Sequence, residues 1–139
     1  MSNKSQKGVA AVELAVILPF LLILLAGIIE FSLMLYNMQV LTNGAREGAR
    51  VAVIPVRNET EEEIANIVKD YCGNKLIGFQ NDKVINVSIV GYGGATGSDL
   101  TVTASYNYGF FIPGLFDFLG INKSNRIFNI NGKATMQFL

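Results

Sequence analysis

The feature that most constrains this chain is an apolar run from Val9 to Ile29, in which Glu13 is the only charged residue. As an α-helix the run would be roughly 30 Å long, which is about the thickness of the hydrocarbon core of a bilayer. It therefore predicts a membrane-spanning helix. The chain has 139 residues, so at most one small domain can fold outside this helix.

The composition argues against several classes of function. The chain has 11 basic and 11 acidic residues, and this balance does not favour a nucleic-acid-binding surface. It has no histidine, the commonest general base and metal ligand. Its single cysteine, Cys72, has no partner for an intrachain disulfide, and we interpret it as a small apolar residue on a helix. No catalytic grouping stands out, so we expect no enzyme activity, no cofactor and no metal site.

The charges on either side of the apolar run predict its orientation. Lys4 and Lys7 precede the run without any acidic residue, and Arg46 is the first basic residue after it. The positive-inside rule therefore places the first eight residues in the cytoplasm and the chain after about residue 35 across the membrane. A signal peptide would have the same polarity, but its apolar core spans only about 7–15 residues. We expect an uncleaved anchor or one trimmed on its cytoplasmic side, with cleavage at Ala26 as the alternative.

Glu13 is the anomaly of the run, because a carboxylate in hydrocarbon is costly and suggests a function. The simpler alternative places Glu13 among lipid headgroups beside Lys7. The segment from Lys7 to Glu13, KGVAAVE, resembles the cleavage region of type IV prepilins and pseudopilins. In those proteins a short basic leader ends in glycine, and the following hydrophobic helix has glutamate at its fifth position. The resemblance implies that a prepilin peptidase cuts between Gly8 and Val9 from the cytoplasmic side.

The residue types suit this processing. Gly8 has no side chain to obstruct the scissile carbonyl, and glycine tolerates an extended backbone in a protease cleft. Cleavage would give Val9 a new ammonium group. Glu13 of a neighbouring subunit is a natural counter-charge, because an unpaired charge in an apolar bundle is costly. We therefore expect Glu13 to act in subunit assembly.

A longer segment, from residue 7 to about residue 53, resembles the TadE-like family of tight-adherence (Flp) pilus assembly proteins. The shared features are Gly8 to Glu13, Leu18-Pro19, Gly27 followed by Glu30-Phe31, and the sequence TNGAREGAR from Thr42 to Arg50. The last is the most specific, and its core motif comprises Ala45, Arg46, Glu47, Gly48, Ala49 and Arg50. Gly44 departs from the family pattern, in which alanine is expected more often.

The TadE-like resemblance implies a pseudopilin that is needed for pilus biogenesis or adherence. The partners implied are the prepilin peptidase, other pilus or pseudopilin subunits, the Tad assembly machinery and the lipid bilayer. No nucleic acid is among them.

The membrane helix is expected to continue outside the bilayer as a spine. No proline follows Pro19 until Pro55, and apolar residues recur on one side at Phe31, Leu35, Met38 and Leu41 or Thr42. Unbroken from Val9 to Val53, the helix would be roughly 65 Å long. Pro19 should kink it or locally open its hydrogen bonds.

Gly44, Gly48 and Ala52 recur every four residues and form a smooth stripe for close helix packing. Glycine in an exposed helix costs about 1 kcal/mol relative to alanine, so close packing should compensate. The packing partner is either the chain's own sheet or a neighbouring subunit. Arg46 and Arg50 project from another face, which we interpret as a solvated, salt-bridged surface.

The remainder predicts an α+β head. Thr60 and Glu63 form a capping box for a second helix that ends near Gly73, and its apolar stripe is Ile64, Ile67, Val68, Tyr71 and Cys72. Segments 83–92, 99–108 and 126–138 alternate between apolar and polar residues, which predicts about three antiparallel strands half covered by helices. The third strand should face the helices with its apolar side chains, which are Phe128, Ile130, Ala134, Met136 and Phe138. The sequence GYGGATGSD predicts a hairpin connection.

These patterns divide the chain into a cytoplasmic leader (1–8), a transmembrane and spine helix (9–53) and an extracytoplasmic head (54–139). The unusually apolar segment 109–121 is either extra core or a contact with the membrane or a partner. Two functions are open. The first is a structural pseudopilin or minor pilin in the cytoplasmic membrane, within or at the base of a surface pilus. The second is an uncleaved single-pass envelope protein whose head binds a ligand or partner.

Overall fold

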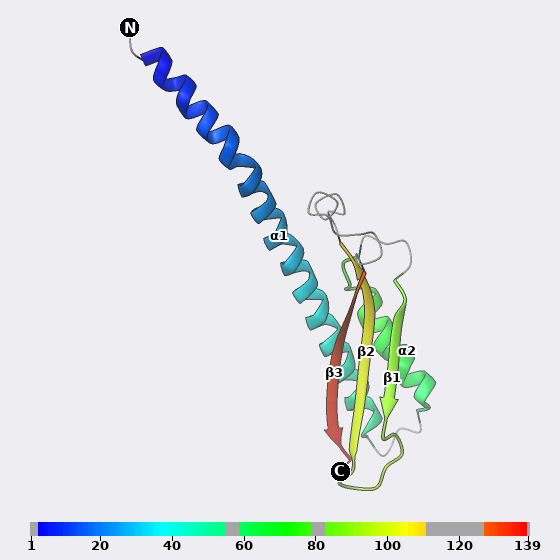
Figure 1. Ribbon diagram of the computed structural model, residues 1–139. Helices are drawn as coiled ribbons and strands as arrows, with labels where there is room; N and C mark the ends of the chain where they lie inside the picture. The colour runs from blue at the N-terminus through cyan, green and yellow to red at the C-terminus, as the bar shows by residue number, and fades with distance from the viewer. Residues whose placement is uncertain (1–2, 55–58, 79–82, 111–126, 139) are drawn as a thin grey trace.

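The structure is a computed structural model that describes residues 3–54, 59–78, 83–110 and 127–138, with side chains described from residue 8 onward. Its elements are α1 (Asn3–Ala52), α2 (Glu61–Gly73), β1 (Ile85–Val90), β2 (Asp99–Gly109) and β3 (Ile127–Gln137). The first half of α1 stands clear of every other element, and its second half lies against a head made of α2 and the sheet (Figure 1). This arrangement confirms the predicted α+β fold with one long and one short helix and three antiparallel strands.

α1 is a continuous helix of 50 residues, which corresponds to a length of about 75 Å. Pro19 lies inside the helix without ending it. The helix ends at Ala52, three positions before Pro55 in the sequence, where a proline disfavours further helix. The apolar run and the predicted spine therefore form one continuous helix.

α2 begins with the predicted capping box. The Thr60 hydroxyl accepts a hydrogen bond from the Glu63 backbone N–H at 3.3 Å, and the Thr60 backbone N–H donates to the Glu63 carboxylate at 2.7 Å. Both bonds satisfy backbone donors that the first helical turn leaves open. The buried side of α2 consists of Ile64, Val68 and Cys72, one turn apart from one another.

The sheet has the order β1-β2-β3, and both strand pairs are antiparallel. α1 packs against β2 and β3, whereas α2 packs against β1 and against α1, so both helices cover the same face. The side chains that β2 turns to this face are all buried: Leu100, Val102, Ala104, Tyr106 and Tyr108. The alternate positions of β2 are polar and more exposed, as predicted for a half-covered sheet.

Gly132 of β3 marks the closest approach of α1 to the sheet. A Cβ atom at this position would overlap the backbone of Leu41 and Thr42. Glycine is needed here because the helix backbone occupies the place of a side chain.

The expectation about the apolar face of β3 is wrong in part. Phe128 was expected to face the core, but it is 51% exposed near the start of β3. Phe31 and Leu35 are also exposed, and the side of α1 that the head buries carries the polar residues Glu30 and Asn37. These polar side chains are accommodated by hydrogen bonds from the head, so hydrophobic periodicity does not reveal the buried side. The prediction for segment 109–121 lies, beyond Phe110, outside the described residues.

Candidate functional site

The exposed half of α1 is the first candidate site. From Gly8 to Ile29 its apolar side chains have little or no cover from the head, and within the described residues Gly8–Ala52 is the one helix long and apolar enough to cross a membrane. In water this surface would be strongly unfavourable. A bilayer or apolar neighbours must therefore cover it.

The predicted cleavage site lies near the start of this exposed half. Gly8 and Val9 are both within α1, and a Cβ atom at Gly8 would meet no atom within 4 Å. Packing within the chain therefore gives no reason for glycine at position 8. The helical backbone there would have to unwind to enter a protease cleft, which glycine makes easier than other residues.

Glu13 is exposed on the same part of α1. No hydrogen bond or ion pair among the described side chains involves it. Its carboxylate is thus separated from the head, and it lies one helical turn beyond Val9. Any group that neutralises Glu13 inside an apolar surrounding must come from the N-terminal segment or from another molecule.

The TNGAREGAR segment lies at the other end of α1, where two elements of the head meet it. A Cβ atom at Gly44 would overlap the Cys72 sulfur, and one at Gly48 would overlap a methyl group of Val68. The stripe therefore faces α2 of its own chain, with Val102 of β2 also near Gly48. The third stripe residue, Ala52, is half-buried.

The other motif residues divide between core and solvent. Ala45 and Ala49 are completely buried, whereas Arg46 and Arg50 are exposed. The Glu47 carboxylate accepts two hydrogen bonds from the Arg50 guanidinium, at 3.0 and 2.5 Å. In this chain the small residues of the motif pack α1 into the head, and the charged residues form its solvated side.

Sequence reasoning missed a buried polar contact at the point where α1 enters the head. Glu30 is only 5% exposed, and its carboxylate accepts a hydrogen bond of 2.8 Å from the Tyr108 hydroxyl. Burial raises the pKa of Tyr108, and the hydrogen bond and negative charge of Glu30 raise it further. The tyrosine therefore stays protonated and acts as a donor. The available signal was an acidic residue directly after the apolar run, in helical register with Asn37 and Leu41.

A second missed contact joins α1 to the segment after α2. The Asn37 side chain is completely buried, donates to the Ile77 carbonyl at 2.7 Å and accepts from the Ile77 N–H at 2.9 Å. The amide thus pairs with the backbone as a neighbouring strand would. Together with the Tyr108 contact, it fixes the head on the spine directly after the apolar run.

The described residues contain no group of three or more His, Cys, Asp or Glu side chains that could hold a metal ion. Cys72 is buried and its sulfur lies 3.8 Å from the Val40 carbonyl oxygen. Burial raises the pKa of its thiol, which lowers its reactivity as a nucleophile. The contacts of Glu30, Asn37 and Cys72 thus hold α1 against the head.

A long helix with one apolar, uncovered half and one half packed into a small α+β head is consistent with a membrane-anchored class of protein. The family model described as TadE-like protein matches residues 8–50. The match confirms the resemblance found in the sequence: residues 8–50 of this chain are similar to the TadE-like family. Neither the curated proteins nor the solved structures contain a significant match.

Proposed function

We propose that this chain is a structural pseudopilin, or minor pilin, of the Tad (Flp) pilus assembly system. The observation that carries the proposal is the division of α1. Its matched segment, residues 8–50, joins an uncovered apolar half to a half that forms part of the core of the head. Such a subunit can leave its head outside the membrane and pack its bare helix first against lipid and then against the helices of other subunits.

The first step in this function is removal of the leader after Gly8 by a prepilin peptidase. Gly8 supports this step because nothing in the fold requires glycine there, in contrast to Gly44, Gly48 and Gly132. The leader contains Lys4 and Lys7, which favour its retention in the cytoplasm, where the peptidase would act.

Mass spectrometry of the chain purified from cells with the Tad system tests the cleavage. We expect a mature N-terminus at Val9. Gly8→Leu should remain uncut, whereas Gly27→Ala, which replaces another glycine without packing contacts, should be processed normally. An intact Met1 or an N-terminus created near Ala26 would contradict the proposal and favour an uncleaved envelope protein or a cleaved signal peptide.

The second step is assembly through Glu13. A carboxylate in an apolar helix bundle is stabilised by an opposite charge, and the ammonium group of Val9 in a neighbouring processed subunit would supply one. Within the described part of the chain no side chain competes for this role.

Glu13→Ala should reduce co-purification with other pilus components while leaving membrane insertion intact. Val12→Ala, a neighbouring substitution on the exposed helix, is the matched control and should assemble normally. Normal assembly of Glu13→Ala would refute the pairing, even if cleavage after Gly8 were observed.

A further inference from the structure

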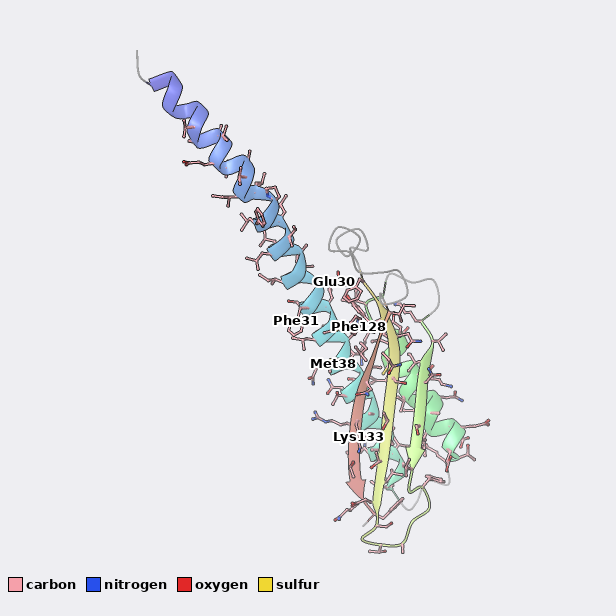
Figure 2. All side chains as sticks on the ribbon, viewed as in Figure 1. Glu30, Phe31, Met38, Phe128 and Lys133 are labelled. Carbon is pink, nitrogen blue, oxygen red and sulfur yellow. The ribbon has the colours of Figure 1, made fainter. Side chains whose placement is uncertain are left out.

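The end of the head from which the bare half of α1 leaves carries exposed apolar side chains. Phe31 of α1 is 57% exposed, and Ile127 and Phe128 at the start of β3 are 56% and 51% exposed. We call these three residues the membrane-proximal patch. Figure 2 labels Phe31 and Phe128 at this end of the head, on neighbouring elements. Large exposed apolar side chains gathered at one end of a molecule are typical of an interaction surface.

The patch is built on a supported aromatic cluster. The rings of Phe128 and Phe110 meet edge to face with their centroids 5.3 Å apart, and Phe110 meets Tyr108 in the same manner at 6.0 Å. Tyr108 in turn donates to Glu30 on α1. One side of the Phe128 ring is therefore held by the head, and the rest of the ring is presented outward.

The register of the sheet gives the height of the patch along α1. Gly132 lies against Leu41 and Thr42, and Phe128 is four residues closer to the start of β3. At about 3.3 Å per strand residue this distance is about 13 Å, or roughly nine helical residues, which places Phe128 near the level of residues 32 and 33. The contact between Tyr108, the register partner of Phe128, and Glu30 agrees with this level.

The position of the outer membrane boundary can be measured along α1 as well. Val9 to Ile29 fills roughly 30 Å of hydrocarbon, so the outer boundary falls near Ile29 when this run spans the bilayer. The membrane-proximal patch is then only about 5 Å beyond the hydrocarbon, within a headgroup layer that adds roughly 5–8 Å on each side. Aromatic side chains are enriched at this depth in membrane proteins.

The head also has no linker that would let it move away from the bilayer. Glu30, the residue directly after the apolar run, is already buried in the head. Asn37 fixes the next two turns to the backbone at Ile77. The end of the sheet is therefore held against the membrane surface by the same helix that crosses it.

We propose that the membrane-proximal patch inserts into the outer interface of the bilayer, so that the head is a second, shallow membrane contact beside the spanning helix. This inference rests on the membrane-spanning orientation in the proposed function. It adds a lipid-facing role for the sheet through Ile127 and Phe128, which lie outside the segment matched by the TadE-like family model, whereas Phe31 lies within it.

The chain contains no tryptophan, so a single introduced tryptophan gives an unambiguous fluorescence signal. The experiment uses the full chain in phosphatidylcholine vesicles whose acyl chains are brominated either near the headgroup or near the chain end. Phe128→Trp should be quenched by bromine near the headgroup and only weakly by bromine near the chain end. Val90→Trp, at the far end of β1 and 63% exposed, is the matched control and should not be quenched by either lipid.

Phe20→Trp, in the middle of the apolar run, separates the two proposals and should be quenched most by bromine near the chain end. Quenching of Phe20→Trp without quenching of Phe128→Trp would overturn the interfacial insertion while leaving the span in place. If Phe20→Trp were not quenched by bromine near the chain end, the membrane span itself would be overturned. A blue shift of Phe128→Trp that increases with the protein-to-lipid ratio, without quenching by either lipid, would overturn the inference and assign the patch to a second copy of the chain.

Discussion

Two neighbouring tyrosines of β2 allow a direct comparison between a buried hydroxyl with a hydrogen-bond partner and one without a partner among the described residues. Tyr108 and Tyr106 both point into the core and are almost fully buried. The Tyr108 hydroxyl donates to the Glu30 carboxylate, whereas the Tyr106 hydroxyl has no hydrogen-bond partner among the described residues. Replacement of each by phenylalanine removes one oxygen atom and keeps the ring, so neither variant leaves a large cavity.

The expected losses of stability differ because the hydroxyls differ in what they satisfy. A hydrogen bond to a charged group contributes about 1.5–3 kcal/mol, and its removal leaves a buried carboxylate with one donor fewer. Tyr108→Phe should therefore lower the free energy of unfolding of the head by about 1.5–3 kcal/mol. Tyr106→Phe removes a buried hydroxyl that has no hydrogen-bond partner among the described residues, so it should be neutral or stabilising.

The free energies can be measured by urea unfolding of the full chain in detergent micelles, followed by the near-ultraviolet circular dichroism of the packed aromatic residues. The slope of the free energy of unfolding against urea concentration should be the same in both variants, because the surface exposed on unfolding is unchanged. Equal losses in the two variants would show that the Tyr108 hydroxyl contributes no more to stability than the Tyr106 hydroxyl, which would contradict a stabilising Glu30 contact. A neutral Tyr108→Phe would refute the role of that contact in fixing the head to the spine.

Three further perturbations test the packing and protonation of the head. Gly44→Ala should destabilise it by roughly 1–3 kcal/mol, because the new methyl group overlaps the Cys72 sulfur, and a double-mutant cycle with Cys72→Ala should recover most of the loss. Asn37→Ala should cost about 1–3 kcal/mol in the same unfolding assay, whereas the exposed Gln39→Ala should cost under about 0.5 kcal/mol. The raised pKa of Tyr108 means that its protonated form stabilises the fold fully below about pH 10 and that this stability is lost at higher pH, so Tyr108→Phe should flatten the alkaline part of a stability profile.

The elements of this fold were predictable because each depends on local pattern. The length of α1 follows from an apolar run and a proline-free extension, and the start of α2 follows from two side chains three residues apart, Thr60 and Glu63. Strict alternation in β2 likewise reflects one covered and one open face of the sheet.

The junction of spine and head was not predictable from the same patterns. Glu30 and Tyr108 are 78 residues apart, and Asn37 and Ile77 are 40 residues apart. Each contact places a polar group on a buried side, where hydrophobic periodicity predicts an apolar one. The partner of the glycine stripe was also undetermined, because small residues indicate close approach without indicating which element approaches.

The family match and α1 cover nearly the same residues, and TNGAREGAR is the part of both that packs into the head. The match ends at Arg50 and α1 ends at Ala52, so the shared signature describes the spine and not the sheet. Within that signature, Gly44 and Gly48 make room for α2, and the two motif alanines are buried beside them. α2 and the sheet, which pack on this surface of α1, both lie outside the matched segment. Ile127 and Phe128, which we propose to contact the membrane interface, thus belong to the part of the chain outside the matched segment.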